Sequence, residues 1–218
     1  MKIFLVIILA LVLALASAIS VSAAPILFSL DVLPSGSVEK DGHAALAGED
    51  DLTTTIISGG TMFGKFKVGA EYGTGTIEEK DGNNDFSIWG LKGGYRVLDA
   101  RATKLDAIIV VLGIDTEKNK LDGTLVGFDF TQYFSEKMFL SGSYVFGIDG
   151  SHEHDLLGSD DDTSISLLRL KFNYLVAEKL GLALGYTDLR YEVDHSTPVS
   201  GRLDVSLGGI SLGVFYIF

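Results

Sequence analysis

Two short segments that combine histidine with acidic or hydroxyl residues are the first places where this chain could do chemistry. His152-Glu153-His154-Asp155 puts two histidines on one side of an extended segment, and imidazole is the commonest ligand of transition metals. His195 lies between Asp194 and Ser196, the residue types of an acid–histidine–hydroxyl centre. Adjacency in sequence does not arrange these groups around a substrate. We therefore interpret both segments as exposed polar loops and predict no catalytic residue and no metal ligand.

A third segment partly matches a calcium-binding loop. Asp81-Gly82-Asn83-Asn84-Asp85 offers oxygen atoms at the first, third and fifth positions of that pattern. The segment then departs from the pattern, because Phe86 stands where glycine is needed and Lys92 where the bidentate glutamate is needed. The sequence predicts no calcium loop here and no cofactor elsewhere.

The composition limits which elements could position these residues. The 218 residues include 26 glycines and no cysteine, and 17 Lys and Arg stand against 29 Asp and Glu, giving a net charge of −12. An acidic chain lacks the basic face that nucleic acids require, and the lack of cysteine excludes disulfides and thiolate chemistry. The mean hydropathy of +0.32 is high for an acidic protein. This combination indicates a membrane-associated chain whose charged and apolar residues are segregated.

The first 23 residues are typical of a secretory signal peptide. Lys2 precedes an apolar block at residues 3–16, and small residues follow at alternate positions. We predict cleavage after Val21-Ser22-Ala23, with Ala16-Ser17-Ala18 as the second choice, and one mature domain at residues 24–218. An uncleaved anchor is the alternative, but the apolar block is short for a spanning helix.

Several later segments alternate between apolar and polar residues, as half-buried β-strands do. In residues 65–72 the apolar side chains occupy the even positions, and lysine, glycine and glutamate occupy the odd ones. The same division recurs in residues 89–97, 126–131, 140–149 and 168–174. A soluble β-sandwich also alternates, but its polar face seldom carries so many glycines. A bulky face opposed to a face of glycine, serine and charge suits a membrane β-barrel with a polar lumen.

Turn signals divide the mature chain into ten strands. Eight of them are predicted at residues 64–77, 86–98, 105–115, 121–134, 138–149, 163–177, 180–193 and 203–218. Two more, at residues 25–33 and 52–58, precede these, with Gly59-Gly60 as the turn after the second. The predicted fold is all-β: a closed antiparallel up-and-down transmembrane β-barrel with short turns at one end and longer loops at the other. Eight strands with an N-terminal extension is the alternative.

The last strand carries an outward row of apolar residues at Leu212, Val214, Tyr216 and Phe218. This row resembles the C-terminal signature of bacterial outer-membrane β-barrels. The whole mature chain resembles a small outer-membrane β-barrel protein of the opacity or outer-membrane protein W-like kind, with no subfamily signature. The resemblance implies an outer-membrane location among lipid and lipopolysaccharide. It also implies insertion by the barrel-insertion machinery, which would recognise these four residues.

Charged residues on the inward face form the candidate site. The predicted lumen charge network consists of Lys65, Lys67, Glu71, Lys92, Arg96, Asp129, Arg169 and Lys171. Such charges must be paired or hydrated, so one hypothesis is a salt-bridge network that closes the lumen. The other is a narrow conduit that favours anions. We predict a non-enzymatic barrel with a structural or surface-interaction role, and a porin-like passive channel as the alternative.

Acidic residues gather in the predicted outer loops. They are Glu39, Asp41, Glu49, Asp50, Asp51, Glu78, Glu79, Asp81, Asp85, Glu153, Asp155, Asp160, Asp161 and Asp162. A solvated, self-repelling surface explains them. Alternatively, they could bind divalent cations, because hard cations take several carboxylate oxygens.

Overall fold

The computed structural model describes residues 25–41, 48–79, 82–117, 119–154, 158–160, 163–195 and 201–218. The predicted signal peptide lies outside these residues. The strands are β1 (Ile26–Asp41), β2 (Gly48–Phe63), β3 (Phe66–Glu79), β4 (Gly82–Asp99), β5 (Thr103–Thr116), β6 (Asn119–Tyr133), β7 (Met138–His154), β8 (Gly158–Asp160), β9 (Ser164–Leu175), β10 (Leu180–His195) and β11 (Gly201–Ile217). Within the described part of the chain, no helix is long and apolar enough to cross a membrane.

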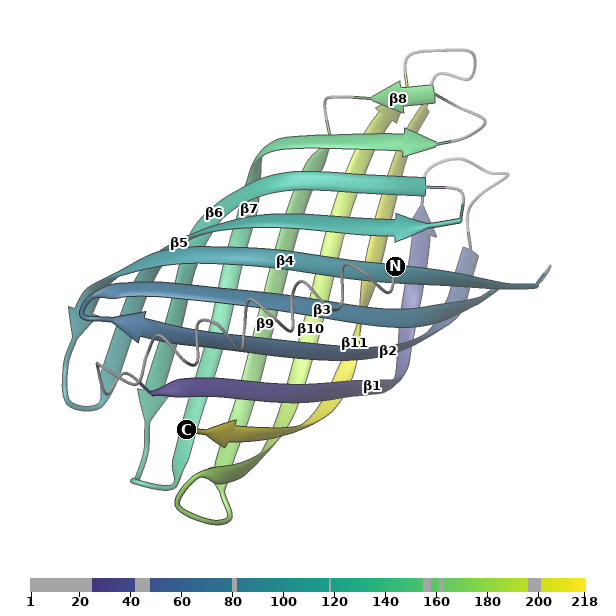
Figure 1. Ribbon diagram of the computed structural model, residues 1–218. Helices are drawn as coiled ribbons and strands as arrows, with labels where there is room; N and C mark the ends of the chain where they lie inside the picture. The colour runs from purple at the N-terminus through teal and green to yellow at the C-terminus, as the bar shows by residue number, and fades with distance from the viewer. Residues whose placement is uncertain are drawn as a thin grey trace, which may run out of the picture.

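Ten of these strands close into an antiparallel up-and-down barrel (Figure 1). Each barrel strand pairs with the next one along the chain, and β1 pairs with β11 to close the ring. The short β8 pairs with β7 within the connection to β9. The prediction of ten strands is confirmed. The eight-stranded alternative is wrong, because β1 is paired with both β2 and β11 along its length.

The turn predicted at Gly59-Gly60 is misplaced. Both glycines lie inside β2, where Gly60 pairs with Leu27 on one side and Gly69 on the other. A Cβ at Gly60 would approach the Val68 carbonyl oxygen to 3.0 Å, so this glycine allows close packing of the strands. The turn falls at Gly64, whose φ of +62° is the left-handed conformation that tight hairpin turns use.

The barrel strands also run further toward the outer end than the sequence pattern indicated. Strand β1 continues to Asp41 instead of ending at residue 33, and β2 begins at Gly48 instead of residue 52. Several of the acidic residues assigned to loops therefore lie in strands. Among them are Glu39, Asp41, Asp50, Asp51, Glu78, Glu79, Asp85 and Glu153.

The two faces of the strands exchange character partway along the barrel, as β10 illustrates. Its outward side chains are apolar as far as Tyr186, and Leu184 is 54% exposed. Beyond Tyr186 the outward positions carry Asp188 and Arg190, and the buried apolar residue Leu189 points inward. We call the part of the barrel with apolar outward side chains the apolar-walled half and the part with polar outward side chains the polar-walled half.

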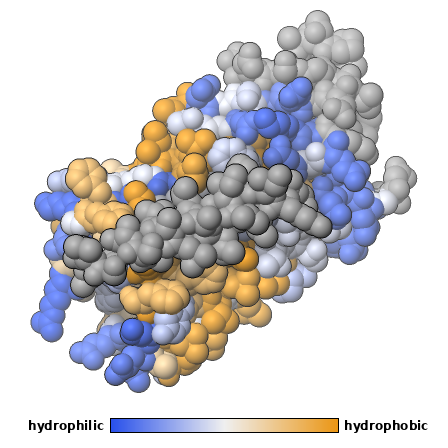
Figure 2. All heavy atoms as spheres, in the orientation of Figure 1, coloured by the Kyte–Doolittle hydropathy of each residue, from blue (hydrophilic) through white to orange (hydrophobic). Residues whose placement is uncertain are grey.

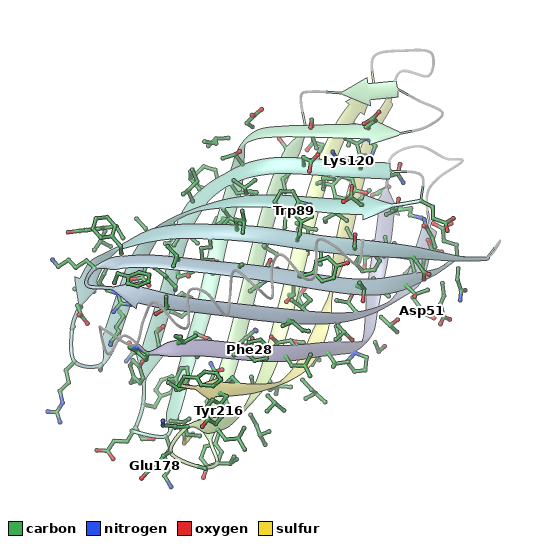
Figure 3. The ribbon with its side chains drawn as sticks, in the orientation of Figure 1. Phe28, Asp51, Trp89, Lys120, Glu178 and Tyr216 are labelled. Carbon is green, nitrogen blue, oxygen red and sulfur yellow. The ribbon has the colours of Figure 1, made fainter. Side chains whose placement is uncertain are left out.

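This exchange recurs around the barrel. In β9 the outward row runs from Tyr174 and Phe172 to Ser166, and in β4 it runs from Leu91 and Trp89 to Asp85. Figure 2 shows the resulting apolar band, with a broad group of hydrophilic atoms at one end of the barrel and smaller groups at the other. Figure 3 places Asp51 and Lys120 near the end with the broad group and Glu178 at the opposite one. The lumen is polar, as predicted, in the apolar-walled half only.

Candidate functional site

Charged side chains meet across the lumen of the apolar-walled half. Arg169 on β9 donates two hydrogen bonds to the Glu71 carboxylate on β3, one of them at 2.8 Å. Lys171, two residues further along β9, lies with its Nζ 2.6 Å from Asp31 Oδ2 on β1. These pairs join strands that are not neighbours in the sheet, so they hold opposite walls together.

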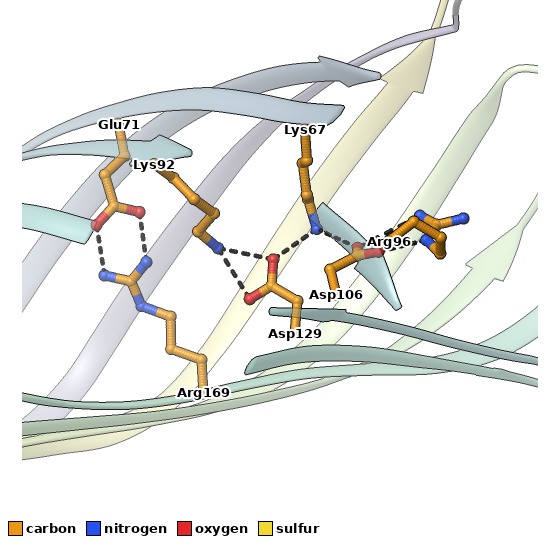
Figure 4. Close-up of polar contacts among 7 residues, drawn as sticks. All are labelled: Lys67, Glu71, Lys92, Arg96, Asp106, Asp129 and Arg169. Atoms are coloured by element: carbon orange, nitrogen blue, oxygen red, sulfur yellow. Dashed lines mark hydrogen bonds and ion pairs between the residues drawn. The ribbon is translucent and has the colours of Figure 1, made fainter. Parts of the chain in front are cut away.

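A second group of ion pairs centres on Asp129 of β6 (Figure 4). Its carboxylate accepts hydrogen bonds from Lys92 at 3.0 and 3.1 Å and from Lys67. Lys67 also donates to Asp106 at 3.3 Å, and Arg96 forms a two-pronged pair with the same carboxylate. We call all these residues the ionic layer: Asp31, Lys67, Glu71, Lys92, Arg96, Asp106, Asp129, Arg169 and Lys171.

The structure brings seven of the eight predicted network residues into the ionic layer. Lys65 stands apart: it lies exposed in the β2–β3 turn, and its Nζ is 5.9 Å from the centre of the Tyr95 ring. Sequence reasoning missed the carboxylates of Asp31 and Asp106. Each occupies the polar position between two apolar neighbours, Leu30 and Val32 in the first case, so the alternation could have revealed them.

Buried apolar side chains fill the lumen of the polar-walled half and extend beside the ionic layer on β5, where Val110 pairs with Lys92. We call them the apolar layer. Leu112, Leu125 and Val145 are at most 1% exposed. The layer consists of Leu33, Val38, Leu52, Ile77, Phe86, Ile88, Ile108, Val110, Leu112, Ile114, Leu121, Leu125, Val145, Ile165, Leu167, Leu189 and Val205. A cavity of about 80 Å³ separates it from part of the ionic layer and is lined by Glu71, Arg169 and Lys171 below and Leu52 and Leu189 above.

Aromatic rings lie at the other end of the lumen. Phe139 packs edge-on against Phe215 with ring centres 5.8 Å apart, and Tyr133 lies 5.4 Å from Phe139. Phe215 is 3% exposed. The ionic layer is therefore enclosed between an aromatic floor and an apolar layer.

Polar side chains return at the outer mouth, beyond the apolar layer. Lys40 on β1 bonds Asp50 on β2 at 2.9 Å and Glu79 on β3 at 3.0 Å. Burial lowers the pKa of Lys40, but its hydrogen bonds and charge interactions with these two carboxylates outweigh burial and raise the pKa overall. The rest of the mouth carries amide, imidazole and hydroxyl groups. We call the whole set the polar ring: Lys40, Asp50, Glu79, Asn84, Asn119, His152 and Thr163.

The histidine and acidic segments considered for metal binding or catalysis are only partly described. The expectation of an exposed loop is wrong for His152, which is buried in β7 with its ring stacked on Tyr191 at 6.0 Å between centres. Nothing is described of the side chains of His154, Asp155, Asp194, His195 and Ser196. Asn84 and Phe86 of the partial calcium pattern are buried in β4. Among the described residues, no group of three or more His, Asp or Glu could hold a metal ion.

The predicted insertion row lies on the outward face of β11. Leu212, Val214, Tyr216 and Phe218 are all exposed there, and β11 is hydrogen-bonded to both β1 and β10. The row thus belongs to the apolar exterior. Its recognition by insertion machinery stays a prediction.

No protein-family model and no curated protein sequence matches the chain. Among solved structures, the outer membrane protease OmpT from Escherichia coli is similar with a TM-score of 0.61 at 11% identity, over 89% of this chain and 97% of that one. Neisserial surface protein A aligns with a TM-score of 0.43 at 13% identity, over 88% and 97% of the two chains. Ail of Yersinia pestis aligns with a TM-score of 0.33 at 10% identity, over 89% of this chain and 99% of that one. The likeness to OmpT shows the fold, which is that of a small outer-membrane β-barrel, and no subfamily is assigned.

Proposed function

We propose that this barrel serves the outer membrane as a structural and surface-interaction protein and conducts no solutes. The observation that carries the proposal is the apolar layer. A solute crossing the lumen would have to displace side chains such as Leu112 and Leu125, which are buried on all sides. Apolar constrictions of this kind stop conduction by excluding water.

The ionic layer is a second observation that supports a closed lumen. Five cations face four carboxylates, and every one of the nine takes part in an ion pair. Charges engaged with one another across a lumen hold its walls together, and moving them apart would leave buried charges without partners. The channel hypothesis would require a hydrated path past Lys92, Arg96, Arg169 and Lys171, and these residues are already engaged.

We propose no catalytic activity. The similar structure OmpT is a protease, but an identity of 11% relates the two folds and not their residues. The histidine that the structure describes fully, His152, stacks on Tyr191 beside the apolar layer.

Conductance across planar lipid bilayers tests the proposal. The purified mature protein should give no discrete current steps at high protein load, while a porin in the same bilayers provides the positive control. Reproducible single-channel steps from the folded protein would refute the closed lumen. A polypeptide that stays folded and monomeric in buffer without detergent would refute membrane integration itself.

A further inference from the structure

The polar ring brings together residues from seven places around the outer mouth. Ion pairs join Lys40 to Asp50 and Glu79, which places the ends of β1, β2 and β3 together. On the opposite side Leu121 pairs with His152, and Asn119 lies two residues beyond Leu121 on the same face of β6. Asn84 on β4 and Thr163 before β9 continue the ring, with the Thr163 backbone N–H bonded to Gly150. The registers of these strands put the ring at one level.

Three oxygen atoms of the ring are buried without a hydrogen bond. Asn84 Oδ1, Asn119 Oδ1 and Thr163 Oγ1 find no partner in the part of the chain that the structure describes. Asn84 and Thr163 are 8% and 6% exposed. Buried polar atoms in folded proteins are nearly always hydrogen-bonded, to water or a ligand where protein groups do not serve. All three atoms can accept, so the group that completes them is a donor.

The net charge of the polar ring determines which kinds of hydrogen-bond donor it favours. Lys40 is the one cation among its seven residues and is engaged by Asp50 and Glu79, so two carboxylates outnumber it. This balance repels anions, since like charges in a partly buried site are poorly screened. It accepts neutral hydroxyl groups and favours ammonium groups.

We infer that the polar ring is a binding site for a small molecule that carries several O–H or N–H donors and no negative charge, such as a sugar or an amino sugar. Mouths of β-barrels are preferred places for small-molecule sites. The apolar layer beneath closes the ring from the lumen, so the ligand would approach from outside the barrel. The inference rests on the closed lumen and membrane placement of the proposed function and adds a ligand class to it.

Titration of the detergent-solubilised, full barrel with glucose, glucosamine and glucose 6-phosphate tests this site by NMR. Glucose and glucosamine should give saturable shifts of the Asn84 and Asn119 side-chain amides and the Thr163 methyl group. Glucosamine should bind at least as tightly as glucose, and glucose 6-phosphate about tenfold more weakly. A preference for glucosamine would identify ammonium recognition, and equal affinity would identify hydroxyl recognition.

Two neighbouring asparagines of β4 give a matched pair of variants. Asn84→Ala should weaken sugar binding about tenfold, whereas Asn83→Ala, on the exposed outward face, should leave the affinity unchanged. Thr163→Val removes a second acceptor with little change of volume and should also weaken binding if Asn84→Ala does not fold. Absence of saturable shifts with both sugars, or binding that is equal in all variants, would overturn the site and mean that water alone completes the three oxygens. Either failure leaves the bilayer test of the closed lumen intact.

Discussion

The apolar-walled and polar-walled halves of this barrel are built in opposite ways from the same ten strands. In the first, Leu184 and Tyr186 face outward while Lys171 and Arg169 face the lumen. In the second, serines and charged residues face outward, and the lumen is filled by buried apolar side chains. The contrast indicates that the surrounding solvent changes from hydrocarbon to water at this point of the wall, because each half exposes what its solvent accepts.

The side chains that fill the lumen of each half depend on which side chains its outer face requires. A strand offers alternate side chains to its two faces, so the residues left for the lumen are those that the outside does not use. Hydrocarbon gives no hydrophobic driving force to a packed interior, and cross-lumen ion pairs then hold the walls of the apolar-walled half together. Water does give that driving force, and the polar-walled half uses it.

A buried charge in the apolar layer should have the largest effect on stability. Ile165→Asp places a carboxylate without a partner where the side chain is 3% exposed, and it should lower the free energy of unfolding by about 3–5 kcal/mol. Its neighbour Ser164 is exposed on the outward face, and Ser164→Asp should change that free energy by less than about 0.5 kcal/mol. Urea unfolding in lipid vesicles measures both. Equal effects would mean that the polar-walled half has no dry interior.

Removal of one partner from the ionic layer should have the next largest effect. Arg169→Met leaves Glu71 inside the barrel without its hydrogen-bonded cation, which should lower the free energy of unfolding by about 1–3 kcal/mol. The double variant Glu71→Met with Arg169→Met should recover most of this loss, because no unpaired charge remains. Lys120→Met breaks the exposed pair with Asp122 and serves as the control, with no measurable change. Failure of the double variant to recover would mean that the ion pair itself stabilises the barrel.

The depth of the boundary between the halves should appear as a small spectroscopic effect. Trp89 is the only tryptophan, and it faces outward at the edge of the apolar-walled half, covering Gly113. Aromatic residues of membrane barrels gather at the bilayer interfaces. Lipids brominated near the headgroup should therefore quench Trp89 more than lipids brominated near the chain end. The reverse order should hold for a Trp89→Phe, Leu184→Trp variant, and identical depths for the two tryptophans would contradict the boundary.

Local alternation and turn signals were enough to predict the barrel and its ten strands. Apart from the turn at Gly64, the turns lie between segments that alternate, so positions such as Ser135–Lys137 could be recognised individually. The first two strands were harder, because Thr53 and Thr55 of β2 face outward where the wall is already polar, while Leu52 faces inward. Along β2 the apolar side chains therefore change from inward to outward positions. A search for one constant alternation finds only a poor match there.

The contents of the lumen could be predicted only in part. Lys67, Arg96, Arg169 and their neighbours are polar residues in apolar strands, so their inward position followed from sequence. The inward position of the apolar layer could not be predicted in this way. Residues 108–112 of β5 form one continuous apolar run, in which alternate side chains face outward and into the lumen. The polar ring depends on the ends of distant strands reaching one level, which only the registers decide.

The exchange of character along the strands also fixes where the barrel can come to rest. A barrel displaced deeper into the membrane would bring Asp188, Arg190 and Glu192 into hydrocarbon. A barrel displaced outward would remove Leu180 and its apolar neighbours from lipid. Both displacements are unfavourable, so the wall itself sets the depth of the barrel in the bilayer. A chain entering the bilayer from one side would halt at the same height each time.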